Sequence, residues 1–284
     1  MRFNIIGAGR LGKNIALALS HAEIAVLHSI ANLSLTSGKL SCDAIGSGTA
    51  VEKIEDLPAA DITWITTNDD SIQPIVSLLA ARALLKPGSF VIHCSGVLNS
   101  KLLEPLKKMG CHISSFHPLK AFKTGYLDSN AFLNVECIAE GDEKVCAWLK
   151  DSFTRLGAHV MRLNPEAKAG YHAAACIASN YLITLASCSE HLLLNAGFTS
   201  EQARIMLVKL MQGNLDNLKA SPSIADALTG PLMRGDTGTL SLHLAAIDNP
   251  LFQDFYKAAG LATLPLTQLT DDKKKLIMEL LAIS

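Results

Sequence analysis

The sequence predicts an α/β fold: a Rossmann-type, doubly wound and mostly parallel sheet, followed by an all-α C-terminal domain. Two observations predict the sheet. GAGRLG at 7–12 follows an apolar run and precedes a helical pattern, and short apolar runs then alternate with helical stretches, as in parallel strands joined by helices. A third observation predicts the helical part, because strand signals stop after Asn164-Pro165. A chain of 284 residues is long enough for two domains, which we expect at 1–164 and 165–284.

The individual elements follow from hydrophobic periodicity. Apolar runs predict strands at 3–6, 24–29, 62–67, 90–94, 112–116, 135–139 and 159–163. Helical spacing predicts helices at 12–20, 71–84, 142–156, 166–195, 199–219, 240–247, 250–259 and 268–282. Thr199-Ser200 offers a helix start and Asn195-Ala196-Gly197 a helix stop.

Composition restricts the class of protein. With 49% hydrophobic residues and a net charge of −1, the chain gives no electrostatic reason to expect nucleic acid as a partner. The seven cysteines include no C-x-x-C pair, so we expect reduced thiols and no metal site. The sequence begins without the pattern of a signal peptide, so we expect a cytoplasmic protein. No charged residue occurs between Lys168 and Glu190, but polar side chains interrupt this segment, which predicts a helix buried in protein rather than a membrane span.

The glycine loop at 7–12 predicts a dinucleotide site. In a turn from strand to helix, Gly7 permits the tight bend, Gly9 lets the backbone approach a diphosphate, and Gly12 permits close packing of helix on strand. The loop Gly7-Ala8-Gly9-Arg10-Leu11-Gly12 would hold the anion at the helix N-terminus, where free N–H groups and the helix dipole favour negative charge. The competing interpretation is a purely structural turn.

The identity of the cofactor depends on the end of the second strand. An NAD site usually has Asp or Glu about 20 residues after the loop, whereas this chain has Leu27-His28-Ser29 there and Asn32 a little later. The lack of a carboxylate favours NADP over NAD, although no arginine occupies the position either. We assign Ser29 to the cofactor.

Small polar residues follow two further strands, at the sheet edge where open α/β folds bind ligands. Thr67 and Asn68 end one strand and Ser95 follows the next. We expect Thr67, Asn68 and Ser95 to line the nicotinamide ribose, and Ser95 to border the reacting group. Asn68 is equally suited to capping the next helix.

Reduction or oxidation at a carbon also needs a side chain that moves a proton. His117 follows a predicted strand and could orient a carbonyl or simply bond a loop. Lys168 and His172 share a helix face within roughly 40° at about 100° per residue, whereas Asn180 is rotated by roughly 80° from His172. We take His172, Lys168, His117 and Ser95 as catalytic candidates and Asn180 as a substrate contact, with buried or solvated structural roles as the alternative.

Arg234 lies in a turn-rich stretch, Leu228-Thr229-Gly230-Pro231-Leu232-Met233-Arg234-Gly235-Asp236. A guanidinium can hold a carboxylate or phosphate with two parallel hydrogen bonds. Arg234 is therefore a candidate for binding an anionic substrate, and pairing with Asp236 is the alternative.

Several motifs together resemble a family of Rossmann-like oxidoreductases that end in domain of unknown function 2520 and have no assigned reaction. They are the glycine loop, His93-Cys94-Ser95-Gly96, Phe116-His117-Pro118-Leu119 with Phe122, Tyr171-His172-Ala173-Ala174-Ala175 with Ser179-Asn180-Tyr181, Leu228-Thr229-Gly230-Pro231, Arg234-Gly235-Asp236 and His243. The match extends over the whole chain.

The resemblance implies a helical domain similar to that of 6-phosphogluconate and β-hydroxyacid dehydrogenases, which pairs to form homodimers. The layout is also similar to pyrroline-5-carboxylate reductase and to prephenate dehydrogenase, which has a comparably placed His-Pro sequence. The β-hydroxyacid dehydrogenase pattern of paired glycines, lysine and asparagine on one helix is not cleanly present, because Lys168 and Asn180 lie too far apart.

We therefore expect an NAD(P)-dependent oxidoreductase that acts on a small anionic substrate in a cleft between the domains. A regulatory protein that binds the dinucleotide without turnover is the alternative, and a dimerisation protein with a degenerate site is a third class.

Overall fold

The computed structural model describes residues 1–283. By its internal contacts the chain divides into two compact units, Met1–Ile177 and Ala178–Ser284. The predicted domain boundary near residue 164 stays a prediction: it follows the last strand, whereas the division by contacts falls inside the next long helix.

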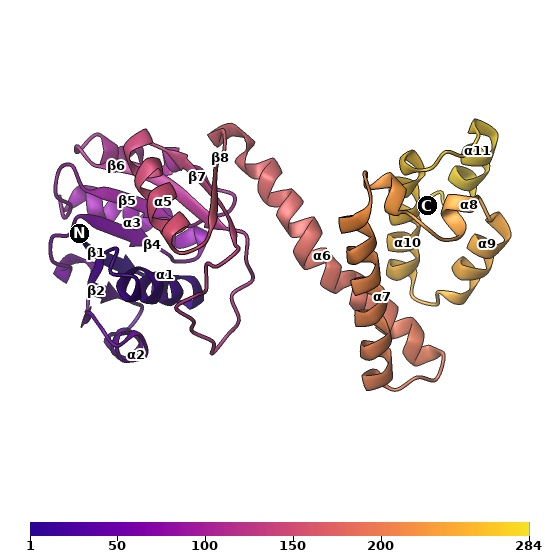
Figure 1. The fold of residues 1–284 in the computed structure, drawn as a ribbon, viewed down its shortest axis with the longest axis horizontal. Helices are drawn as coiled ribbons and strands as arrows, with labels where there is room; N and C mark the ends of the chain where they lie inside the picture. The colour runs from indigo at the N-terminus through magenta and orange to yellow at the C-terminus, as the bar shows by residue number, and fades with distance from the viewer. Residues whose placement is uncertain (284) are drawn as a thin grey trace. The chain divides into compact units, whose positions relative to one another are not determined.

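The N-terminal unit is built on one eight-stranded sheet in the order β3-β2-β1-β4-β5-β6-β7-β8 (Figure 1). Its strands are β1 (Arg2–Ile6), β2 (Val26–Ala31), β3 (Thr49–Val51), β4 (Ile62–Ile65), β5 (Phe90–His93), β6 (His112–Pro118), β7 (Glu136–Gly141) and β8 (His159–Arg162). The β6–β7 pair is antiparallel, and the other six neighbouring pairs are parallel. The order reverses between β1 and β4, which is the position where doubly wound sheets bind ligands.

Helices cover both faces of this sheet. They are α1 (Arg10–His21), α2 (Leu35–Ile45), α3 (Asp69–Ala81), α4 (Glu104–Lys107) and α5 (Glu143–Arg155), with short 3-10 helices at Ile54–Asp56, Ser100–Leu103 and Pro165–Ala167. Side chains of α1, α2 and α5 pack in one apolar cluster around Trp64 and Phe116. Side chains of α3 and α4 pack in a second cluster around Ile65 and Val91. The doubly wound, mostly parallel fold predicted from the sequence is confirmed.

The α2–β3 segment was not predicted. Its helix is capped at the start by Ser34, whose hydroxyl accepts from the Ser37 amide at 3.2 Å, and at the end by Gly46 with a φ of 77°. Serines, a threonine and a glycine occupy most of its first turns, so its apolar stripe is weak. Packing of Cys42 and Ile45 against the sheet stabilises this segment.

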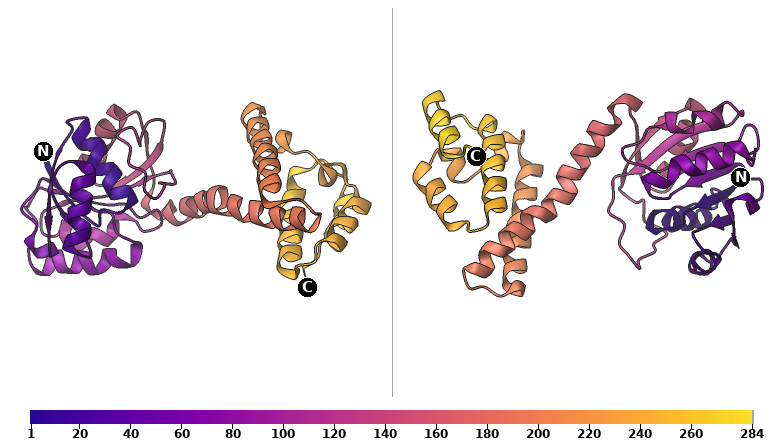
Figure 2. Two further views of the ribbon diagram at one scale, coloured as in Figure 1. Left: turned by 90° about the horizontal axis from the view of Figure 1, so that it is seen from below. Right: turned by 180° about the vertical axis from the view of Figure 1, so that it is seen from behind.

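The C-terminal part is helical, as predicted, and no strand occurs among residues 178–283 (Figure 2). The long helix α6 (Lys168–Asn195) begins in the N-terminal unit and ends in the C-terminal one. It is followed by α7 (Ser200–Ala220), α8 (Pro231–Arg234), α9 (Thr237–Ala246), α10 (Pro250–Thr263) and α11 (Asp271–Leu280), with 3-10 helices at Ala225–Ala227 and Leu264–Leu266. A small core of Leu240, Leu264, Ile277 and Leu281 lies in this unit.

Helix α7 begins at the residue that the sequence indicated. The Thr199 hydroxyl accepts from the Gln202 amide at 3.2 Å, and the Gln202 side chain accepts from the Thr199 amide at 3.0 Å. Each bond satisfies a backbone donor that the first helical turn leaves free. Among the described residues, no helix combines the length and apolarity that a membrane span requires.

Candidate active site

The loop between β1 and α1 has a different local requirement at each of its three glycines. Gly7 has a φ of 89°, and a Cβ there would lie 2.5 Å from Thr67 Cγ2. A Cβ on Gly12 would lie 2.4 Å from Thr66 Oγ1, so this glycine lets α1 approach β4 closely. A Cβ on Gly9 would meet nothing within 4 Å. The protein itself therefore requires Gly7 and Gly12, whereas the space beside Gly9 is open.

The start of α1 is open to an anion. Gly9 is its N-cap and has no side chain to accept from the first amides, and no acidic residue occurs in the first turn. The free N–H groups of a helix N-terminus and the helix dipole attract negative charge. The local geometry fits a diphosphate above Gly9.

The end of β2 bears an amide side chain rather than a carboxylate. Strand β2 ends at Ala31, and the next residue, Asn32, accepts from the Ala8 amide at 2.7 Å and donates to Ser41 Oγ at 3.3 Å. Ser29 lies two residues inside the strand and is buried. Sequence spacing pointed to Ser29, but the structure places Asn32 at the strand end beside the glycine loop, because the strand extends two residues further than predicted.

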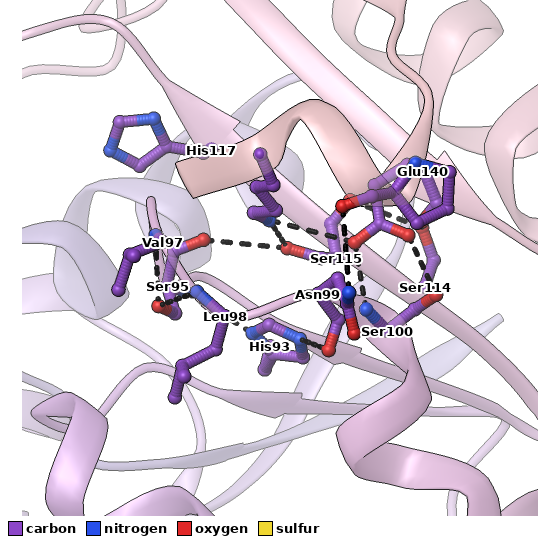
Figure 3. Close-up of polar contacts among 12 residues, drawn as sticks. His93, Ser95, Val97, Leu98, Asn99, Ser100, Ser114, Ser115, His117 and Glu140 are labelled. Carbon is purple, nitrogen blue, oxygen red and sulfur yellow. Dashed lines mark hydrogen bonds and ion pairs between the residues drawn. The ribbon is translucent and has the colours of Figure 1, made fainter. Parts of the chain in front are cut away.

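The small polar residues after β4 and β5 shape the turns at the same sheet edge. Ser95 Oγ accepts from the amides of Val97 at 3.2 Å and Leu98 at 2.9 Å (Figure 3). Asn68 precedes α3 and its amide oxygen accepts from the Ser71 hydroxyl. Thr67 Oγ1 is buried and has no hydrogen-bond partner among residues 1–283. Of the predicted set, Thr67 therefore retains an unused hydroxyl at this edge.

Lys168, a predicted proton-transfer residue, lies in a buried ion pair. Its side chain is 1% exposed; Nζ donates to Ser115 Oγ and lies 3.6 Å from Glu140 Oε1. Glu140, which is fully buried, also accepts from the Ser100 amide at 2.7 Å and hydroxyl at 2.6 Å (Figure 3). Burial lowers the pKa of Lys168, and the Glu140 carboxylate partly offsets that effect.

This ion pair attaches the first turn of α6 to β6 and β7. Sequence reasoning missed Glu140 and Ser100. The available signal was a glutamate that directly follows the predicted strand at 135–139, because an acid at the end of a buried strand requires a partner.

Two histidines and a tyrosine meet where β6 ends, all within the N-terminal unit. His117 Nδ1 lies 2.9 Å from the Tyr171 hydroxyl, and the rings of His117 and His172 have centroids 5.6 Å apart. A Cβ on Gly96 would lie 2.3 Å from His172 Nδ1 and 2.9 Å from His117 Nε2. Gly96 is thus the residue that lets both imidazoles lie against the loop after β5.

Burial controls the ionisation of this group. It lowers the pKa of His117 to about 4, with further lowering by the charges of Lys168 and His172. Burial also raises the pKa of Tyr171 to about 12. His172 Nδ1 is buried without a hydrogen-bond partner in residues 1–283. His117 and Tyr171 are therefore neutral hydrogen-bonding groups near pH 7.

His93 has a different role in the same region. It lies in β5, accepts from the Ser95 amide at 3.2 Å through Nδ1, and pairs through Nε2 with the Asn99 carbonyl at 3.2 Å (Figure 3). Burial and the Lys168 charge lower its pKa to about 3. Both ring nitrogens are used to shape the loop that contains Ser95 and Gly96.

The two expected substrate-binding residues belong to the C-terminal unit. Arg234 donates from Nε to Asp236 Oδ2 at 2.9 Å, and both side chains are exposed. Asn180 is an exposed residue of α6. The local pairing that was the alternative for Arg234 is thus present, and the roles of Arg234 and Asn180 toward a substrate stay predictions.

Solved structures with the same architecture span nearly the whole chain. A provisionally named NADP oxidoreductase of Bacteroides fragilis has a TM-score of 0.76 at 18% identity, covering 93% of this chain and 98% of its own. A protein of Thermotoga maritima has a TM-score of 0.67 at 22% identity, with 98% of each chain covered. A 1-pyrroline-5-carboxylate reductase of Streptococcus pyogenes has a TM-score of 0.62 at 16% identity, covering 97% and 98%. These likenesses concern the fold. No curated protein sequence matches the chain.

Two family models match the sequence itself. Residues 1–118 match a Rossmann-like domain, and residues 135–263 match domain of unknown function 2520. The chain therefore combines a Rossmann-like domain with a domain of unknown function 2520, which confirms the family indicated by its motifs.

Proposed function

We propose that the protein is an NAD(P)-dependent oxidoreductase that acts on a small anionic substrate. The single observation that carries the proposal is the contrast within the glycine loop: side chains at positions 7 and 12 are excluded by the protein, whereas position 9 faces open space. Because Gly9 is also the N-cap of the helix after β1, this open space lets a diphosphate approach the free amides at the helix N-terminus. The names of the structural neighbours from Bacteroides fragilis and Streptococcus pyogenes support the same class of reaction.

The cofactor would be held by the backbone of residues 7–12 and would supply or accept the hydride. We propose NADP rather than NAD, because the residue after β2 is Asn32 and no carboxylate there repels a 2′-phosphate. Thr67 and Ser95 border the site from β4 and β5. Within this proposal, Asn32 replaces Ser29 as the candidate for the ribose.

We assign the proton transfer that accompanies hydride transfer to the two neighbouring imidazoles, His117 and His172. His172 has a buried nitrogen without a partner and lies beside His117, so we assign proton transfer to His172 and orientation of the reacting group to His117. Lys168 is already occupied by Glu140 and Ser115, and we assign it to holding the start of α6. Arg234 and Asn180 remain the proposed contacts for the substrate anion.

We further propose a cytoplasmic homodimer that forms through the helical unit. Many large apolar side chains of that unit are exposed on the single chain, among them Ile183 at 69% and Leu210 at 67%. Exposed apolar side chains in such number are typical of a surface that a partner covers. The cytoplasmic location is supported by the seven free cysteines, because thiols persist in reducing compartments.

The decisive experiment is Gly9→Ala, measured by thermal shift and fluorescence titration with NADPH and NADH. Gly9 has a φ of −75° and an added Cβ meets no protein atom within 4 Å, so the variant should fold normally. Wild-type protein at about 100-fold saturation should gain roughly 2.7 kcal/mol from the ligand, and the variant should lose most of that gain. Gly213→Ala, in α7 and also without a contact for its Cβ, is the matched control and should bind as wild type does.

The other classes of protein give different results in the same assay. A dimerisation protein with a degenerate site would show no stabilisation by either dinucleotide. A regulatory protein would be stabilised but would not oxidise NADPH with a panel of keto acids, aldehydes and imines. For an enzyme, His172→Gln should lower turnover while NADPH affinity stays unchanged.

A further inference from the structure

Tyr171 contacts the proposed site but has no assigned role in it. It lies in the first turn of α6, three residues after Lys168. Its hydroxyl is 2.9 Å from His117 Nδ1, and the two rings meet edge to face with centroids 5.8 Å apart. The ion pair of Lys168 fixes the helix turn that presents this hydroxyl.

The direction of the hydrogen bond between these residues determines which nitrogen of His117 bears the hydrogen. With a pKa of about 12 for Tyr171 and about 4 for His117, both groups are neutral near pH 7. A phenol O–H is a stronger acid than the N–H of a neutral imidazole, and an imidazole nitrogen is a stronger base than a phenol oxygen. The phenol therefore donates and Nδ1 accepts, so the hydrogen of the imidazole lies on Nε2.

The Nε2 nitrogen is available to a ligand. It makes no hydrogen bond within residues 1–283 and is not among the fully buried polar atoms that lack a partner. It lies on the side of the ring that faces Gly96, next to His172. An N–H at this position can donate to a substrate at the carboxyl edge of the sheet.

We propose that Tyr171 is a positioning residue that holds His117 in the Nε2–H tautomer, and that the substrate therefore presents a neutral acceptor, a carbonyl or hydroxyl oxygen, at its reacting carbon. The substrate class rests on the proposed oxidoreductase function, whereas the tautomer does not. A carbonyl oxygen accepts from a neutral N–H, but the nitrogen of a protonated imine has no lone pair left to accept with. The site is accordingly suited to ketones or alcohols rather than to protonated cyclic imines.

The tautomer is tested by nitrogen NMR of protein labelled with 15N-histidine, near pH 7 and without dinucleotide. His117→Gln identifies the His117 signals by their loss. In the wild type we expect the hydrogen on Nε2. In Tyr171→Phe, which retains the ring and removes the donor, we expect a mixture of both tautomers. Tyr181→Phe, an exposed tyrosine on the same helix, is the matched control and should leave the His117 signals unchanged.

Two results would overturn the role of Tyr171: a hydrogen on Nδ1 in the wild type, or an unaltered tautomer in Tyr171→Phe. A merely structural tyrosine would change stability without moving the tautomer. Turnover of cyclic imines with no turnover of ketones or secondary alcohols would overturn the substrate class. Failure of the wild type to bind NADPH would contradict the proposed function alone, because the tautomer is read without a cofactor.

Discussion

The two units of the chain differ in how completely a single copy buries its apolar side chains. The N-terminal unit buries Trp64, Phe116 and Phe153 in one apolar cluster and Ile65 and Val91 in a second. The C-terminal unit has a buried cluster of only four residues within the described chain, while large side chains such as Ile183 and Leu210 are exposed. The first unit thus buries most of its large apolar side chains without a partner. The second has apolar surface that a partner could cover.

The units also differ in their buried polar chemistry. In the N-terminal unit, Lys168, Glu140 and His93 are buried and each makes hydrogen bonds to neighbouring residues. In the C-terminal unit, the ion pairs His191–Asp248 and Arg234–Asp236 are exposed. Burying a charged group costs free energy, and catalytic sites commonly contain buried ionisable groups. We therefore propose catalysis at the sheet edge and association through the helices, and each proposal can be tested by substitution.

The largest effect is expected for Lys168→Met. The variant leaves the Glu140 carboxylate buried without its cation, which should lower the free energy of unfolding by about 3–5 kcal/mol. Denaturant unfolding followed by tryptophan fluorescence reports this unit, because both tryptophans, Trp64 and Trp148, lie in it.

Two further variants isolate the buried pair. Adding Glu140→Gln to Lys168→Met should restore much of the stability, because the remaining buried group is then neutral. Lys101→Met breaks the exposed pair with Glu166 and should cost less than about 1 kcal/mol. Equal losses in Lys168→Met and Lys101→Met would mean that burial adds nothing to the Lys168 pair.

The next effect is a loss of stability of the N-terminal unit in mild acid. The folded-state pKa values of His93 and His117, about 3 and about 4, lie below the ordinary value of 6.5. The unfolded chain therefore binds protons that the folded chain does not between about pH 6.5 and pH 4. Stability is complete above this window and is lost as pH falls through it, by about 2 kcal/mol per histidine at pH 5.

Denaturant unfolding at pH 7 and pH 5 measures this loss. His117→Gln should remove about half of the difference between the two pH values, whatever its effect at pH 7. His159→Gln removes an exposed imidazole of the same unit and serves as the control. A pH difference that is unchanged in His117→Gln would show that His117 is already protonated in the folded state or never contributes.

Much of the fold could be predicted because its signals are local. The glycine loop, the apolar strands and the Thr199 capping box depend on neighbouring residues, and the structure contains each of them. The α2–β3 segment was missed because packing on the sheet, rather than its own sequence, stabilises it. Strand β2 was expected to end at residue 29 and continues to Ala31, so the spacing rule pointed to Ser29 instead of Asn32.

The candidate site was predictable as a set of residue types but not as contacts. Lys168 and His172 share a face of α6, as helical spacing indicated, yet their partners come from strands far away in sequence. Lys168 of α6 contacts Glu140 of β7, and Tyr171 of α6 contacts His117 of β6. Spacing along the sequence does not predict such pairs, because the partners belong to different elements. The orphaned nitrogen of His172 is likewise a property of the packed structure.

A smaller effect is expected in the C-terminal unit for Thr199→Ala, which removes the hydroxyl that caps α7. The loss of this bond should cost about 1 kcal/mol. Thermal unfolding followed by far-ultraviolet circular dichroism detects the change, since the unit is helical. If the units unfold independently, the tryptophan signal of the N-terminal unit should not change. A joint shift of both signals would show that the units unfold together.

The smallest effect on the stability of a single chain, and the sharpest test of the difference between the units, is expected for Ile183→Glu. Exposed substitutions usually change stability by less than about 0.5 kcal/mol, and Ile183 is 69% exposed. If a second copy covers this face of α6, the variant must bury a charge on association. Sedimentation velocity should then show a dimer for the wild type and a monomer for Ile183→Glu. Val26→Glu alters a β-branched side chain that is 63% exposed in the N-terminal unit, and it should remain dimeric. A wild type that is a monomer would contradict the proposed dimer. Dissociation by Val26→Glu but not by Ile183→Glu would contradict association through the helical unit.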